Sequence, residues 1–205
     1  CRQIAQEHGF QLRVIEYSEL EIPNYAANPV NRCYFCKGEL FDRLRAIAAD
    51  WGGGAVVADG SIADDLGDYR PGLQAKAERG VRSPLCEAGF TKEDVRALAR
   101  AWGLPNHAKP ASPCLSSRIP YGAPVTREKL QQVAEAERVL RALGFQPARC
   151  RHHGEIARIE VAPETFSRLL ERREEILRRF REIGFLYITL DLQGFRSGSL
   201  NEPLR

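Results

Sequence analysis

The chain has 205 residues, enough for one large or two small domains. Its composition, 43% hydrophobic and 28% charged, is that of an ordinary globular protein, and a formal net charge of +3 is too small to indicate a nucleic-acid partner. No apolar run approaches the ~18 residues of a membrane span, and no secretory signal is visible. Six cysteines, two of them in a Cys-x-x-Cys pair, favour a reducing cytoplasm in which thiols bind metal or react.

The first half of the chain predicts helices alternating with strands. Residues 1–9 have a helical pattern, and a longer helix is expected from about 34 to 50. Thr91, with Asp94 three residues on, is a variant capping box that begins a helix ending near Trp102. Strands are expected at 11–17 and 55–58. This alternation indicates an open parallel α/β sheet, whose ligands lie beyond the carboxyl ends of the strands.

After Gly122 the pattern becomes that of a compact α+β domain. Thr126 is expected to cap a helix that reaches about residue 143. Strands are expected at 146–151, 156–161 and 186–192, with one long helix over 163–183. The sequence therefore predicts two domains, over residues 1–122 and 123–205.

The segment 109–122 joins the two halves and holds the first candidate for chemistry, Cys114. Three prolines stiffen the segment, and Ser117 and Arg118 follow the thiol closely. Stiff loops between elements often carry functional residues. Cys114 is therefore a functional thiol or, in the simpler interpretation, an apolar residue buried under a proline-rich linker.

Cys33 and Cys36 stand at the start of the helix expected over 34–50. A helix N-terminus favours thiolates, and the two-residue gap lets both sulfurs face one metal or form a redox pair. Cys114 is the obvious third ligand, and Cys86 is a candidate fourth. Three thiolates suit an iron–sulfur cluster with one open iron, whereas zinc normally takes four ligands. The pair could also be purely structural.

Two further groups of residues are candidates for binding a ligand. Alternation along the strand puts Arg149 and Arg151 on one face, where they could clamp a phosphate; the alternative is exposed strand charges paired with Glu155 or Glu160. The polar stretch after residue 58 has the composition of a ligand loop and contains Asp64, Asp65, Asp68 and Arg70.

Five ordered motifs together resemble one known family. They are NPVNRCYFCK at 28–37, DGSIADDLGDYRPG at 59–72, CLSSRIPYG at 114–122, RCRHHGEIARIE at 149–160 and TLDLQGFRSG at 189–198. This combination resembles the LarE family, the ATP-dependent sulfur transferases that build the nickel-pincer nucleotide cofactor of lactate racemase. The resemblance covers essentially the whole chain.

The resemblance implies a fold and a reaction. The fold is a Rossmann-like PP-loop ATP pyrophosphatase domain followed by a small α+β C-terminal domain for substrate binding or oligomerisation. In the reaction, ATP with magnesium adenylylates a carboxylate of pyridinium-3,5-biscarboxylic acid mononucleotide, and a sulfur nucleophile displaces AMP to leave a thiocarboxylate. The family's Ser-Gly-Gly-x-Asp-Ser phosphate loop is absent, and Cys1 falls inside the helix expected after it. We therefore expect a chain truncated at its start, whose 205 residues do not turn over ATP alone.

The resemblance also implies two possible sulfur sources. In one branch of the family a single cysteine gives up its own sulfur; aligned back from Ser116-Ser-Arg118, that position falls at Pro113. In the other branch three cysteines hold a [4Fe-4S] cluster, and Cys33, Cys36 and Cys114 match that set. We expect the cluster. The alternatives are that Cys114 is a sacrificial donor, or that the chain is a zinc-stabilised, non-catalytic binding module.

The remaining expectations also follow from the resemblance. Arg118 is expected beside Cys114 at the transfer site. The residues expected to bind the substrate or a phosphate are Arg149, Arg151, Ser117, Asp68, Arg70 and Arg196. The expected partners are a small-molecule nucleotide substrate and further copies of this chain in a homo-oligomer, in the cytoplasm, with neither nucleic acid nor a membrane.

Overall fold

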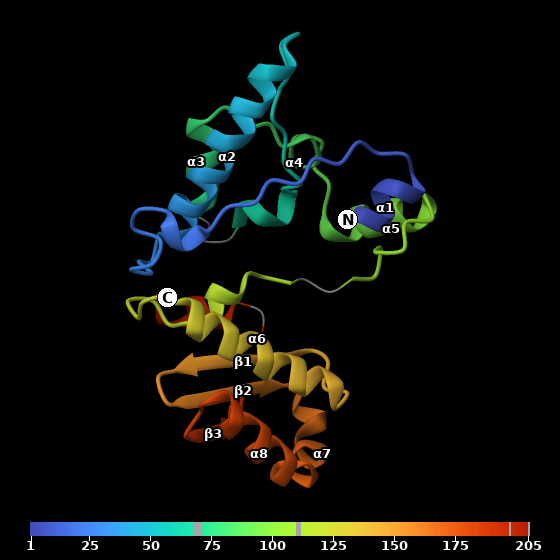
Figure 1. The fold of residues 1–205 in the computed structure, drawn as a ribbon. Helices are drawn as coiled ribbons and strands as arrows, with labels where there is room; N and C mark the ends of the chain where they lie inside the picture. Colours follow the sequence, from blue (N-terminus) through green and yellow to red (C-terminus); the bar gives the residue numbers. More distant parts are fainter. Residues whose placement is uncertain (68–70, 110–111, 197, 205) are drawn as a thin grey trace. The chain divides into compact units, whose positions relative to one another are not determined.

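The structure, a computed structural model, describes residues 1–67, 71–109, 112–196 and 198–204 and divides into two compact units (Figure 1). Unit 1 consists of Cys1–Tyr25 and Asn31–Ser112, and unit 2 of Ala26–Val30 and Pro113–Arg205. The short segment Ala26–Val30 therefore belongs to unit 2, although the residues on both sides of it belong to unit 1.

Unit 1 is built mainly from helices. They are α1 (Arg2–Glu7), α2 (Arg32–Trp51), α3 (Pro71–Glu78), α4 (Pro84–Glu87) and α5 (Lys92–Ala101), with short 3-10 turns η1 (Glu19–Glu21) and η2 (Ala63–Gly67). The long helix expected to begin at the Cys-x-x-Cys pair is confirmed as α2; it ends at Trp51, and its C-cap Gly52 has φ of 66°. It packs against α3, and Arg79, just beyond α3, donates two hydrogen bonds of 2.9 Å to Asp42 on α2.

The capping box expected at Thr91 is confirmed. The Thr91 side chain accepts a hydrogen bond from the Asp94 amide, and the Asp94 carboxylate accepts one from the Thr91 amide. Both bonds satisfy amides of the first turn that have no partner within the helix, and α5 begins there as expected.

The two strands expected in unit 1 are not formed. Residues 11–17 form no regular element and pair with no strand among the described residues, and Leu12 and Val14 are about half exposed. Residues 55–58 make a single parallel bridge, between Ala58 and Arg82. A strand exists only where a neighbour completes its hydrogen bonds, so apolar, β-branched composition alone was an insufficient signal here. Over the described residues of unit 1, the expected parallel sheet is therefore reduced to this one bridge.

Unit 2 has the α+β composition expected for it. Its elements are η3 (Leu115–Arg118), α6 (Arg127–Ala142), β1 (Ala148–His153), β2 (Ile156–Val161), η4 (Pro163–Thr165), α7 (Phe166–Glu171), α8 (Arg173–Ile183), β3 (Tyr187–Leu190) and η5 (Ser199–Leu204). The sheet order is β1-β2-β3, with β1 antiparallel and β3 parallel to β2. Thr126 caps α6 as expected, by accepting from the Lys129 amide.

One expected helix is divided. The prediction of a single helix over 163–183 is wrong, because η4, α7 and α8 follow one another there. The break lies at Arg172, whose amide donates to the Leu169 carbonyl three residues back instead of continuing the α-helical pattern. The strands are also shifted or shortened at their ends relative to the expected 146–151 and 186–192.

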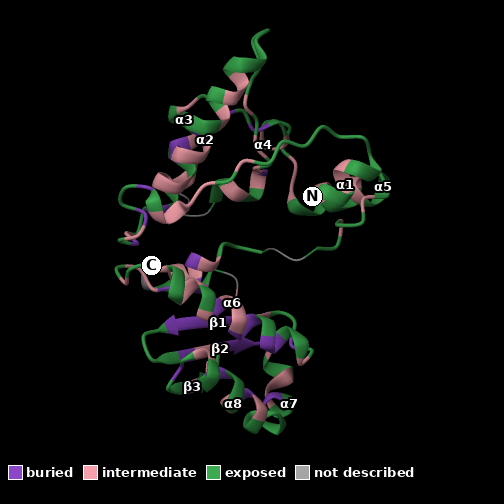
Figure 2. Cartoon of the chain, in the orientation of Figure 1, coloured by how far each residue is buried: buried purple, intermediate pink, exposed green. Residues whose placement is uncertain are grey.

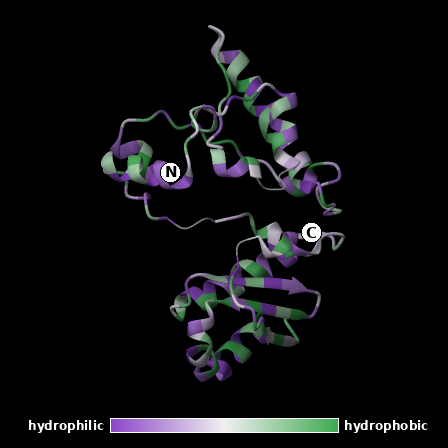
Figure 3. Ribbon diagram, turned by 180° about the vertical axis from the view of Figure 1, so that it is seen from behind, coloured by the Kyte–Doolittle hydropathy of each residue, from purple (hydrophilic) through white to green (hydrophobic). Residues whose placement is uncertain are grey.

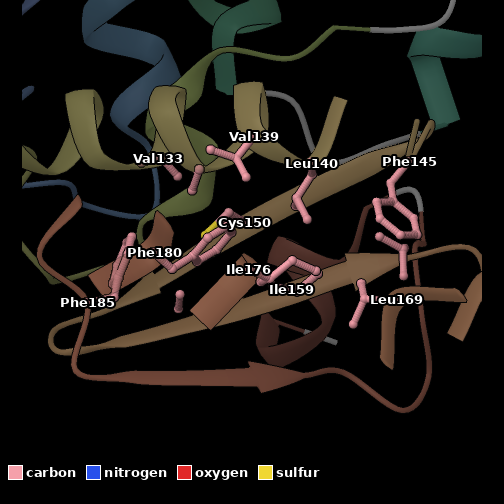
Figure 4. Packing of buried hydrophobic residues seen from close by; sticks show 13 residues of the cluster. Val133, Val139, Leu140, Phe145, Cys150, Ile159, Leu169, Ile176, Phe180 and Phe185 are labelled. Carbon is pink, nitrogen blue, oxygen red and sulfur yellow. The ribbon is translucent and has the colours of Figure 1, made fainter. Parts of the chain in front are cut away.

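The apolar core of unit 2 lies between the sheet and its helices. Figure 4 shows Val133, Val139 and Leu140 of α6 directed toward Cys150 of β1 and Ile159 of β2. The list of buried members is completed by Ala136, Phe145, Ala157, Val161, Leu169, Ile176, Phe180 and Phe185. Burial raises the pKa of the Cys150 thiol far above its ordinary value, so this cysteine is an inert core residue.

The opposite face of the sheet is charged and still buried. Successive strand residues point to opposite faces, so Arg149 and Arg151 alternate with core residues of β1. Figure 2 shows β1 largely as buried, and Figure 3 shows much of the same strand as hydrophilic. Buried charge is costly unless it is paired, so the partners of these arginines show which of the charges is available to a ligand. Among the helices described, none has the length and apolar character to cross a membrane.

Candidate functional site

Cys114 lies at the start of a hydrogen-bonded turn in unit 2. It precedes η3, and residues 113–125 are called the Cys114 loop below. The Cys114 side chain is exposed, which excludes the simpler interpretation of a buried apolar residue. Its carbonyl oxygen accepts hydrogen bonds from the Ser117 amide (3.1 Å), the Ser117 hydroxyl (2.7 Å) and Arg118 Nη1 (3.2 Å). The backbone beside an exposed thiol is thus held by several donors.

Arg118 stabilises this turn through hydrogen bonds to its backbone. Its Nη1 also donates to the Pro113 carbonyl at 3.0 Å, and its Nε and Nη2 donate to the two carboxylate oxygens of Glu137 on α6 at 2.7 and 3.1 Å. Both side chains are almost completely buried. Glu137 Oε1 additionally accepts the Cys150 amide at 3.3 Å, on the outer edge of β1. A buried ion pair is acceptable only when it is hydrogen-bonded in this way, and here it ties the Cys114 loop to α6 and β1.

Arg151 forms a second buried network on the charged face of the sheet. Its Nε and Nη2 donate to the carboxylate of Glu160 at 2.8 and 3.1 Å, and its Nη1 donates to the Ser117 carbonyl at 2.6 Å. Nη2 also contacts the Ser199 hydroxyl of η5. Arg151 therefore pairs with Glu160, as the alternative interpretation had it, but the pair is buried rather than exposed, and it connects β1 and β2 to the Cys114 loop.

Arg149 has a different environment from its neighbour. It is only 8% exposed, its guanidinium lies 4.5 Å from the centre of the Phe195 ring, and Nη1 donates to the Arg196 carbonyl at 3.2 Å. Throughout the described part of the chain, no carboxylate is paired with it. Burial, and then the neighbouring charges of Arg151 and Arg118, lower the pKa of Arg149. A buried guanidinium that has positive neighbours and, among the described residues, no carboxylate partner is a favourable site for an anion.

Arg196 is committed to carboxylates. Its Nε and Nη2 donate to Glu202 at 2.8 and 2.9 Å, and Nη1 lies 3.6 Å from Asp191. The hydrogen bonds to Glu202 raise the pKa of Arg196. Its charge is therefore less available to a ligand than that of Arg149.

The structure brings some of the expected site residues together and leaves others apart. Unit 2 holds Cys114, Ser117, Arg118, Arg149, Arg151 and Arg196. Cys33 and Cys36 are in the first turns of α2 in unit 1; Cys33 is exposed, and the Cys36 thiol donates to Glu19 at 3.1 Å. Asp68 and Arg70 lie outside the described residues. Within the parts of the chain that are described, no group of three or more potential metal ligands is assembled.

Two members of the site were missed in the sequence. Glu137 has a visible signal: it stands four residues after Val133 and three before Leu140, on the apolar stripe of α6, where a carboxylate needs a buried partner. Asn28 has no comparable signal, because its partners lie more than ninety residues away in the sequence.

Comparisons of the sequence with known proteins identify relatives of this chain. No model of a protein family matches it. Over 202 residues it is 48% identical to an uncharacterized protein of Synechocystis, covering 98% of this chain and 75% of that protein. It is 29% identical to an uncharacterized protein of Methanocaldococcus jannaschii over 193 residues, 94% of this chain and 73% of that one.

A third relative has a named activity. Over 201 residues the chain is 43% identical to pyridinium-3,5-bisthiocarboxylic acid mononucleotide synthase of Lactiplantibacillus plantarum, covering 98% of this chain and 72% of that enzyme. Identity of this extent, along nearly the whole chain, confirms the resemblance carried by the five motifs. The chain belongs to the family of pyridinium-3,5-bisthiocarboxylic acid mononucleotide synthase, the LarE family.

Proposed function

We propose that the protein is an ATP-dependent sulfur transferase of nickel-pincer cofactor biosynthesis. It would convert carboxylates of pyridinium-3,5-biscarboxylic acid mononucleotide to thiocarboxylates. Support comes from the named relative, whose name describes a mononucleotide that carries two thiocarboxylates. The proposed substrate is the corresponding dicarboxylate, because it differs from this product only in having carboxylate oxygens where the product has sulfur.

The observation that carries the proposal is the buried guanidinium of Arg149, which lies near the charges of Arg151 and Arg118, the two residues that hold the Cys114 loop. The substrate has two carboxylates and one phosphate, so it needs cationic partners that are not already neutralised. Arg118, Arg151 and Arg196 are paired with Glu137, Glu160 and Glu202, respectively. Arg149 lacks such a carboxylate among the described residues and lies near the positive charges of Arg151 and Arg118, which favours binding of a phosphate.

The paired arginines have a different role in this proposal. Arg118 holds the Pro113 and Cys114 carbonyls, and Arg151 holds the Ser117 carbonyl, so both fix the loop that carries the thiol. We further propose that Ser117 and Arg196 line the phosphate site, and that Asp68 and Arg70 contribute from unit 1. The N-terminal domain would be of the PP-loop type and bind ATP with magnesium.

The chemistry requires activation before sulfur transfer. A carboxylate is a poor electrophile because neither of its oxygens is a good leaving group. Attack of the carboxylate oxygen on the α-phosphorus of ATP releases pyrophosphate and forms an acyl adenylate. A sulfur nucleophile then attacks the carbonyl carbon, the bond to the adenylate oxygen breaks, and AMP departs. The residues of the Arg149 environment would hold the anionic substrate during both steps.

For the sulfur, we propose that Cys33, Cys36 and Cys114 hold a [4Fe-4S] cluster. Cys33 and Cys114 expose their thiols, and the side chain of Cys36 is partly exposed, so all three are accessible as ligands. The donor chemistry fits, because thiolates are the normal ligands of such clusters. When bound, the cluster would supply sulfide to the activated carboxylate. In the sequence, only Asn31 lies between α2 and Ala26–Val30, the segment that belongs to the same unit as Cys114.

The test is purification of the full-length protein without oxygen, followed by iron and sulfide analysis and reaction with ATP and the dicarboxylate mononucleotide. We expect iron and sulfide in the protein, more than one thiocarboxylate per chain when sulfide is supplied, and an unchanged protein mass. One product per chain, with a loss of the mass of hydrogen sulfide, would identify Cys114 as a sacrificial donor. Absence of any thiocarboxylate, with one bound zinc, would refute sulfur transfer.

A further inference from the structure

Asn28 is a buried side chain that contacts the end of the Cys114 loop. It is completely inaccessible to solvent, and its Nδ2 donates to the carbonyl oxygens of Pro120 at 2.7 Å and Ala123 at 2.8 Å, with a longer contact of 3.4 Å to Ile119. A primary amide nitrogen has two hydrogens, so it can satisfy the two nearer carbonyls fully and share a hydrogen with the third. Asn28 thereby gathers three backbone groups of one turn around a single atom.

The backbone of the same segment adds two further bonds. The Gly122 amide donates to the Asn28 carbonyl at 2.9 Å, and the Val125 amide donates to the Ala26 carbonyl at 2.8 Å. Ala26–Val30 is thus bound along the Cys114 loop and not only at one point. This is why the segment belongs to unit 2 despite its place in the sequence.

The residue type matches what the position demands. Asn28 has φ of 56°, in the left-handed region that asparagine tolerates better than most residues. Aspartate tolerates this backbone as well, but it would direct oxygens at three carbonyl oxygens. Glycine tolerates it and offers no side-chain donor. Only an amide side chain of this length serves both the backbone conformation and the three carbonyls.

We propose that Asn28 is a positioning residue for sulfur transfer, which fixes the Cys114 loop at the end opposite to Arg118. Arg118 holds the carbonyls of Pro113 and Cys114 at the beginning of the loop, and Asn28 holds its end. Together, these two supports hold both ends of the loop that contains Cys114 and η3. In the sequence, only Asn31 and Arg32 separate the Ala26–Val30 segment from Cys33. The role in the reaction rests on the proposed function; the fixing of the loop does not.

The test compares Asn28→Gly with the matched control Asn24→Gly in the full-length protein. Asn24 also has a left-handed backbone, with φ of 65°, but its side chain is exposed. Both changes place glycine where it is conformationally suited, so they differ mainly in the buried hydrogen bonds. Hydrogen exchange of peptides from residues 113–125 reports the loop, and peptides from 148–161 report β1 and β2.

We expect Asn28→Gly to accelerate exchange in the loop by roughly ten-fold to several hundred-fold, as for the loss of two or three hydrogen bonds, and to leave β1 and β2 nearly unchanged. The kcat for thiocarboxylate formation should fall by about ten-fold or more, because the loop that carries the thiol loses one of its two supports, while the KM for the mononucleotide changes little. Asn24→Gly should alter none of these quantities.

Three results would overturn the proposal. Loop exchange could be unchanged in Asn28→Gly, or β1 and β2 could be accelerated equally, which would mean that Asn28 only stabilises unit 2 as a whole. Faster loop exchange with an unchanged kcat would show that loop position does not control the reaction. If the unaltered protein itself formed no thiocarboxylate, the proposed function would be wrong, and the exchange comparison alone would decide whether Asn28 fixes the loop.

Discussion

The buried pair between Arg118 and Glu137 predicts a large and specific loss of stability when its negative charge is removed. Glu137→Gln keeps the size of the side chain, and the amide oxygen can still accept from the Cys150 amide and Arg118 Nε. The amide nitrogen then replaces the oxygen that faces Arg118 Nη2. The substitution therefore removes the charge and one acceptor while leaving packing nearly intact.

The size of the effect follows from burial. The side chains of Arg118 and Glu137 are 6% and 4% exposed, so water cannot replace the missing carboxylate. Leaving one buried charge without its partner costs about 3–5 kcal/mol. The exposed pair of Arg178 and Glu182 provides the matched control. It has a similar separation of 2.8 Å but side chains that are about 60% exposed, and such helix pairs contribute only about 0.3–0.5 kcal/mol.

Urea denaturation of Glu137→Gln and Glu182→Gln, followed by circular dichroism, measures both free energies of unfolding. Both tryptophans, Trp51 and Trp102, lie in unit 1, so their fluorescence is unsuitable for a change in unit 2. A loss below about 1 kcal/mol for Glu137→Gln, or equal losses in the two variants, would refute the conclusion that burial makes this pair strong. Combining Glu137→Gln with Arg118→Met should cost less than Glu137→Gln alone, because no buried charge is then left unpaired.

Three further predictions concern ligands and pH. Arg149→Ala should weaken binding of AMP or the mononucleotide by about 1.5–3 kcal/mol in calorimetry, whereas Arg178→Ala should have no effect; equal affinities would remove Arg149 from the binding site. Cys33→Ala should abolish iron binding and keep the circular dichroism spectrum, whereas Cys86→Ala should retain the iron; full iron content in the first variant would exclude the proposed ligand set. Burial, followed by the nearby charge of Lys129, lowers the pKa of His152 below 6.5, so the unfolded chain binds the proton more readily than the folded one. Stability should therefore fall as the pH drops from neutral through 6.5 toward the lower folded value, and His152→Gln should reduce that slope in thermal unfolding.

The sequence was a good guide to unit 2 because its local signals and its packing agree. Thr126 caps α6, the expected strand over residues 156–161 is formed without a change in its bounds, and the alternation on β1 places Arg149 and Arg151 on one face. In unit 1, residues 11–17 carry the same kind of apolar, β-branched pattern but have no neighbouring strand in the part of the chain that the structure describes. A pattern predicts which face a strand would bury; it cannot supply the partner.

For the site, the cations were easier to predict than the groups that neutralise them. Arg118 and Arg151 stand within short motifs, whereas Glu137 comes nineteen residues after Arg118 and belongs to a separate helix. Whether an arginine is free for a ligand depends on such partners. Arg149 and Arg151 are equivalent in the sequence pattern. Only the structure distinguishes Arg149, which has no carboxylate partner among the described residues, from Arg151, which is paired with Glu160.

The contact between the Glu137 carboxylate and the Cys150 amide has a consequence for association between chains. In the sheet order, β1 is an outer strand, and an outer strand offers its backbone amides to any extended segment that approaches. Here an amide of that edge is already occupied by a carboxylate from α6, itself fixed by a buried arginine. A second strand that paired there would have to displace this carboxylate and leave Arg118 without its counterion. At Cys150, the outer edge of β1 is therefore protected against addition of another strand by the same ion pair that supports the Cys114 loop.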